Sequence, residues 1–279
     1  MNFSINDLKE FQIDSKTDKL TCTTSFVKPV HIVMMASIEN YTDKNTSFTN
    51  ETALQYAINM NFKNPLEIDT IDGLNHSKAI KLRNQFDDDG QVNKIMDIFH
   101  NNDYLDKDTN EIVSIILAEI FQNFYAHANN KQAPICCVQD WPASDYIEIA
   151  IADRGIGIKA SLKDILKDYP EDINPCKIAC VSGISCSLDK ESSIGTKHSG
   201  YGLYFTKRFI EENKGYLYLA SYNDCYEITP NSEFDNKLEL GWKGTVVRLI
   251  INKTNFLDCE SFFQTITKEQ EGDDYDEFF

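Results

Sequence analysis

Apolar and polar positions repeat with two different periods along the second half of this chain. Val113, Ile116, Ile120 and Phe124 recur every three or four residues, which predicts one buried face of a helix. Residues 146–153 and 215–221 alternate instead between apolar and polar or small side chains, as half-buried strands do. Residues after Gly202 predict a second amphipathic helix, and residues 244–251 a further strand. The mixture predicts an α+β domain over residues 103–257.

The first 95 residues have a pattern of their own. A β-branched run at 20–26 predicts a strand, and Pro29 is placed to open a helix over 30–39. A loop rich in Asn, Thr and Ser covers 40–50, and a second helix is expected from Glu51 to near Pro65. This order predicts a small α/β domain over 1–95 that resembles STAS domains. The alternative is an extension that packs on the following domain or forms a dimer contact.

Polar residues follow the apolar face of the predicted 113–127 helix. Glu119, Asn123 and His127 are four residues apart, so they form a stripe along one side of that helix. A carboxylate and an amide at the border of a buried face cost free energy unless a partner satisfies them. The stripe therefore predicts a ligand or a metal beside the helix. His127 has a second interpretation, local packing or hydrogen bonding.

Two glycine-containing motifs follow the stripe. Asp153-Arg-Gly155-Ile-Gly157-Ile158 comes directly after a predicted strand, and Gly200-Tyr-Gly202-Leu203 comes directly before a predicted helix. A helix N-terminus offers free amides and a positive dipole end to an anion. Lys197 and His198 precede that turn and are candidates to reach a terminal phosphate. Together and in this order, the three motifs predict a nucleotide site.

These motifs resemble those of the GHKL ATPases, the superfamily of gyrase-type topoisomerases, heat-shock chaperones, sensor histidine kinases, mismatch-repair ATPases and anti-sigma-factor kinases. The resemblance implies a Bergerat-type α/β sandwich, with helices on a mixed, mostly antiparallel sheet. It implies ATP and Mg²⁺ as ligands, Glu119 as general base and Asn123 as magnesium ligand. Asp153 is similar to the aspartate that accepts the adenine amino group, with Gly155, Gly157 and Ile158 around the nucleotide.

The resemblance extends to the rest of the site. The turn with Gly200, Gly202 and Leu203 resembles the phosphate-binding motif, and Thr245 resembles a threonine found beside the adenine. Residues 159–199 correspond to the ATP lid, with short helices expected at 161–167 and 175–181. After residue 257 we expect a C-terminal helix and then an acidic tail, solvated or used as a docking peptide.

Composition narrows the function classes. The net charge of −17 argues against a broad nucleic-acid-binding surface. No apolar stretch approaches the ~18 residues of a membrane helix, and the N-terminus lacks signal-peptide features, so we expect a cytoplasmic protein. The eight cysteines lack paired metal-ligand spacing and are expected to be reduced, buried thiols.

Three functions fit these observations. The first is a regulatory ATPase that uses ATP binding, hydrolysis and lid closure as a switch, with a dimer or an effector protein to read it. The second is a serine/threonine protein kinase of the anti-sigma type, in which Glu119 deprotonates a hydroxyl of a partner protein. The third is a nucleotide-responsive binding module without turnover. His31, His76 and His100 do not lie in a phosphoacceptor sequence, which argues against autophosphorylation on histidine.

Overall fold

The computed structural model describes residues 3–14, 19–42, 45–71, 78–83, 90–100, 102–127, 132–184 and 202–276. It is an α+β structure with one large and one small sheet. The large sheet has the strand order β4-β5-β6-β7-β9-β8, in which β4 and β5 are parallel and the other neighbours antiparallel. Its strands are β4 (Leu66–Glu67), β5 (Ile80–Lys81), β6 (Ile135–Asp140), β7 (Tyr146–Ala152), β8 (Tyr216–Thr229) and β9 (Ser232–Asn252).

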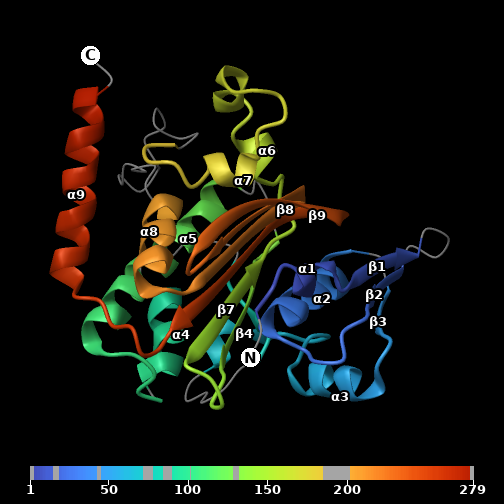
Figure 1. The fold of residues 1–279 in the computed structure, drawn as a ribbon. Helices are drawn as coiled ribbons and strands as arrows, with labels where there is room; N and C mark the ends of the chain where they lie inside the picture. The colour runs from blue at the N-terminus through green and yellow to red at the C-terminus, as the bar shows by residue number, and fades with distance from the viewer. Residues whose placement is uncertain are drawn as a thin grey trace.

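Helices cover one face of this sheet, as Figure 1 shows. They are α4 (Gly90–His100), α5 (Lys107–His127), α8 (Gly202–Asn213) and α9 (Cys259–Asp276). The predicted apolar stripe places α5 here, because Ile116 and Ile120 are buried in one core with the facing strands. Asp106 caps the helix, since its carboxylate accepts from the Thr109 amide at 3.1 Å.

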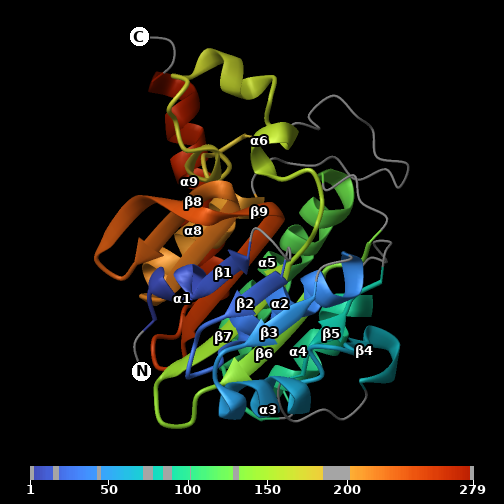
Figure 2. The same ribbon diagram turned by 90° about the vertical axis from the view of Figure 1, so that its right-hand side faces the viewer.

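The N-terminal segment covers the opposite face of the sheet (Figure 2). Its elements are α1 (Asn6–Lys9), β1 (Phe11–Asp14), β2 (Lys19–Cys22), α2 (Pro29–Tyr41), β3 (Thr46–Phe48) and α3 (Glu51–Asn59). The 3₁₀ turn η1 (Ile68–Thr70) follows β4, and its Ile68 is buried in the core of the helical face instead. The helices expected after Pro29 and from Glu51 are confirmed. A second core joins this segment to the sheet, including Val33 and Met34 of α2 with Ala150 of β7 and Ile250 of β9.

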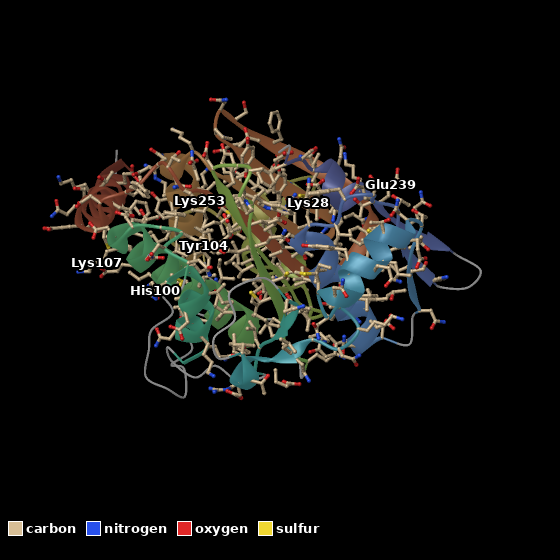
Figure 3. All side chains as sticks on the ribbon, turned by 90° about the horizontal axis from the view of Figure 1, so that it is seen from below. Lys28, His100, Tyr104, Lys107, Glu239 and Lys253 are labelled. Carbon is tan, nitrogen blue, oxygen red and sulfur yellow. The ribbon has the colours of Figure 1, made fainter. Side chains whose placement is uncertain are left out.

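Side chains fill the spaces on both sides of the sheet when the molecule is seen from below (Figure 3). Lys28 lies in the N-terminal segment, where this segment meets the sheet, whereas Lys107 lies in the helical layer. The small sheet has the order β1-β2-β3. Strands β4 and β5 lie within the predicted 1–95 unit but pair into the large sheet through β6. Residues 1–95 are thus divided between the two sheets.

A cluster of buried charges ties the N-terminal segment to β7 and β9. Arg248 and Glu148 are fully buried, and the guanidinium donates to the Glu148 carboxylate at 2.9 and 3.1 Å. Arg248 also binds Asp7 at 2.8 Å, and Asp7 binds Lys28 at 2.8 Å. The amide of Val30, at the start of α2, donates to Glu148 at 3.2 Å. The N-terminal segment thereby supplies partners to charges that the sheet buries.

The lid region and the C-terminus differ from the predicted pattern. The described part of the predicted lid holds α6 (Ile158–Ser161), the 3₁₀ helix η2 (Ile165–Asp168) and α7 (Pro175–Ile178), and α7 lies within the helix expected at 175–181. The helix predicted at 161–167 is thus two short turns. The acidic C-terminus, expected as a solvated tail, continues α9 to Asp276, and Glu269 on this helix binds Arg208 at 2.7 Å. That ion pair joins α9 to α8. Within the described ranges, no helix is long and apolar enough to cross a membrane.

The buried charge cluster generates a stability prediction. Arg248→Met leaves Glu148 buried without its cation, so we expect the free energy of unfolding to fall by about 3–5 kcal/mol. Lys167→Met is the matched control, because Lys167 pairs with Asp164 where both side chains are 71% exposed. Denaturant unfolding monitored by circular dichroism measures both. Equal stability of the two variants would contradict a locking role for Arg248.

Candidate functional site

The start of α8 lies directly against the polar stripe of α5. A Cβ atom added to Gly202 would lie 2.7 Å from Glu119 Oε2 and 3.3 Å from Asn123 Nδ2. Any larger residue would displace the Glu119 side chain, so glycine allows the two helices to approach closely here. Two of the three predicted motifs therefore meet in the structure.

Glu119 is a half-buried carboxylate without a compensating charge. Burial raises its pKa, and no charged group or hydrogen-bond donor within the described ranges offsets that effect. Asn123, one helical turn further along α5, is also half-buried. A carboxylate held in this way is suited to accept a proton or to lie near a cation.

Asp153 lies at the end of β7 and is 2% exposed. One carboxylate oxygen accepts from the Gly155 amide and the other from the Thr245 amide at 3.0 Å. The Thr245 hydroxyl is a further hydrogen-bond partner. Burial outweighs these donors and raises the pKa of Asp153 to about 6. The structure thus places Thr245 beside Asp153.

The turn after Asp153 depends on glycine at one position. Gly157 has φ +77°, and a Cβ there would lie 2.6 Å from the Ser221 hydroxyl. That hydroxyl accepts from the amide of Ile158, the first residue of α6, at 3.0 Å. Ile158 itself is buried. The turn therefore links the end of β7 to the first helix of the lid region.

Residues around this turn were missed by the sequence prediction. Gly244 has φ +117°, and a Cβ there would lie 2.3 Å from the Asp153 carbonyl oxygen. Trp242 donates its indole N–H to the same oxygen at 3.1 Å, and the Arg154 guanidinium lies 4.6 Å from the Trp242 ring centre. The available signal was the pair of glycines, Gly241 and Gly244, that flank Trp242 inside an otherwise regular strand.

Several predicted residues are not placed beside this site. Lys197, His198 and Gly200 lie outside the described residues, as does the lid from 185 onward. His127 is the last residue of α5. Leu203, in the first turn of α8, packs against the core of the helical face. The structure thus brings together Glu119, Asn123 and Gly202 in one group, and Asp153, Gly155, Gly157, Ile158 and Thr245 in another.

A groove lies on the outer side of the Gly157 turn. Tyr222 contacts the Gly157 position and lines this groove with Lys159, Lys163 and Lys167. Lys167 is paired with Asp164 at 2.6 Å, and Glu171 also lines the groove, so its charge is mixed.

Asp7, Glu10 and His31 form a cluster on the N-terminal side, in which Asp7 and His31 are buried and Glu10 is half-buried, with possible ligand atoms within 4.8 Å of one another. Their hydrogen bonds indicate a structural role. His31 Nδ1 accepts from the Lys28 amide, so Nε2 carries the proton and faces Glu10 at 3.0 Å. Lys28 and Arg248 already neutralise Asp7. A cation here would be repelled by two positive charges.

The described cysteines have free thiols, and all but Cys259 are buried. No protein-family model matches the chain, and no curated protein matches it. Its function is therefore inferred from the geometry of the site.

The Glu119 carboxylate, which has no charged partner in the described part of the chain, generates a prediction that needs no ligand. Folding disfavours its ionised form, so the penalty is present above the folded-state pKa and disappears below the unfolded value of 4.5. Glu119→Gln should therefore raise the melting temperature at pH 8 and have little effect at pH 4. Glu111→Gln, at an exposed position of the same helix, is the control. A melting temperature unchanged at both pH values would show that burial of the ionised Glu119 does not destabilise the protein.

Proposed function

We propose that this chain binds Mg-ATP as a GHKL-type regulatory ATPase, in which binding and hydrolysis act as a conformational switch. The contact of Gly202 with Glu119 and Asn123 carries this proposal. It brings a helix N-terminus, a carboxylate with a raised pKa and a side-chain amide to one place. A helix N-terminus suits a phosphate, an amide oxygen suits a magnesium ion, and a carboxylate of raised pKa suits the activation of an attacking water.

The phosphates would lie at the start of α8. The first amides of a helix have no partner within that helix, and the helix dipole favours an anion there. Helix α8 has 12 residues and starts at Gly202, whose lack of a side chain lets the Glu119 carboxylate lie directly against the helix N-terminus. The proposal thus assigns the terminal phosphates to the space between α8 and α5.

Magnesium and water would complete the reaction centre. Magnesium keeps several waters, so the Asn123 oxygen and phosphate oxygens can suffice as its other ligands. A water oxygen attacks the γ-phosphorus, the bond from phosphorus to the β,γ-bridging oxygen breaks, and Glu119 takes the proton of the water. Burial raises the pKa of Glu119 toward neutral pH, which favours its action as a general base.

Adenine would lie at the Asp153 turn. A carboxylate has about four acceptor positions. The Gly155 amide, the Thr245 amide and the Thr245 hydroxyl bind Asp153, which leaves an acceptor position for a ligand. The adenine amino group can therefore bind the same carboxylate. Because α6 starts directly after this turn, occupancy of the adenine site would bias the lid region. A partner protein or a second copy of the chain would read that change.

The first test of the proposal is turnover with γ-labelled ATP and magnesium. Glu119→Ala should lower the rate by roughly 10²–10⁴-fold, as expected for loss of a general base, and leave ATP affinity in calorimetry largely intact. Glu111→Ala serves as the control on the exposed face of α5.

The fate of the label separates the three functions. Free phosphate supports the ATPase, label on a co-purifying protein supports the kinase, and binding without either supports a module without turnover. Wild-type protein that binds no ATP would refute all three.

The second test concerns the metal. Asn123→Ala should weaken ATP binding in the presence of magnesium and have little effect when EDTA removes the metal, because the amide acts through magnesium. Gln122→Ala is the matched control, since a neighbouring residue on a helix points about 100° away. Isothermal titration calorimetry measures both conditions. An equal loss of affinity with and without magnesium would assign Asn123 a direct or structural role instead.

A further inference from the structure

Strand β9 bulges where it passes the Asp153 turn. Ala220 pairs with Val246 and Tyr222 pairs with Trp242, so three residues of β9 oppose Ser221 alone. A bulge leaves backbone groups of the ladder unpaired and redirects neighbouring side chains. The two glycines with positive φ, Gly241 and Gly244, lie on either side of Trp242 and permit this path.

Trp242 lies in the bulge and binds the backbone of Asp153. Its side chain is 1% exposed, and its N–H donates to the Asp153 carbonyl oxygen at 3.1 Å. Arg154, the next residue of the turn, covers the indole ring at 4.6 Å. The ring is therefore enclosed between the sheet core and the turn that carries the carboxylate.

Ser221 holds the other end of the same turn. Its hydroxyl donates to the Gly244 carbonyl at 2.8 Å and accepts from the Ile158 amide at 3.0 Å. The bulge, through Gly244, is thereby joined to the first residue of α6. Both ends of the Asp153–Ile158 turn are fixed by buried groups of the β8–β9 pair.

We propose that Trp242 is a positioning residue for adenine recognition, which it supports by fixing the turn that presents the Asp153 carboxylate, with Ser221 in the same role at Ile158. This inference rests on the proposed ATP site. Trp242 lies outside the three motifs, and through the Asp153 carboxylate it determines the preference for a base with an exocyclic amino group. A base that carries an oxygen in that position has no hydrogen to offer the carboxylate.

The experiment compares ATP with ITP, which has an oxygen in place of the amino group. Trp242→Phe keeps an aromatic ring but removes the N–H that binds Asp153. We expect the affinity for Mg-ATP to fall about tenfold, the effect of one buried hydrogen bond. The affinity for Mg-ITP should change much less, so the ratio of ATP affinity to ITP affinity should fall. Calorimetry measures both constants.

Trp141→Phe is the matched control. Trp141 is also buried, but its indole N–H has no hydrogen-bond partner within the described ranges. This variant should therefore retain the wild-type affinities for both nucleotides. Ser221→Ala provides a second variant, expected to change the ATP preference in the same direction as Trp242→Phe and usable if the latter fails to fold.

A ligand-free measurement separates this inference from the proposed function. Hydrogen exchange at the amides of Gly155 and Ile158 should be faster in Trp242→Phe than in Trp141→Phe, because the turn loses its anchor. Unchanged exchange together with an unchanged ratio of ATP to ITP affinity would overturn the positioning role while ATP binding still stands. Faster exchange in a protein that binds no ATP would refute the ATP site and, with it, the role in adenine recognition.

Discussion

The buried pairing of Glu148 with Arg248 is the constraint on which the arrangement of the sheet depends. Glu148 on β7 and Arg248 on β9 are both fully buried, and a buried charge is tolerated only with partners. Asp7 and the Val30 amide complete those partners from the N-terminal segment. The segment must therefore cover this face of the sheet. Because β7 and β9 also carry Asp153 and Thr245, the same pairing aligns the candidate adenine site.

Carboxylates on the two faces of the sheet differ in whether a partner compensates their charge. Glu148 has a cation and a helix amide, so its charge is compensated within the protein. Glu119, on the helical face, lies beside the backbone of Gly202 and the amide of Asn123, has no compensating charge among the described residues, and burial raises its pKa. An uncompensated carboxylate lowers stability and is retained where a ligand or a reaction uses it. This contrast is the electrostatic support for placing chemistry on the helical face.

The bulge of β9 shows how a sheet can support a turn that it does not contain. In a regular ladder the backbone groups of β9 would pair with its two neighbours, β7 and β8, and leave none for residues 153–158. Because three residues of β9 lie opposite Ser221, the ladder between β8 and β9 is interrupted there. Gly244 allows β9 to approach the Asp153 carbonyl. The resulting anchors are side-chain groups, Trp242 N–H and the Ser221 hydroxyl. These hydrogen bonds are buried and directional, so they hold the turn that carries Asp153 in one conformation.

The sequence alone determined the elements whose pattern is local. The 3.6-residue repeat predicted α5, alternation predicted β7, and Gly202 marked the start of α8, because each depends on neighbours within a few residues. Tertiary structure decided which of these elements meet. The contact of Gly202 with Glu119 and the anchoring of Asp153 by Trp242 join residues far apart in the chain. Periodicity carries no information on such pairs, since strand register, a bulge and buried charge compensation set them only when the whole chain folds.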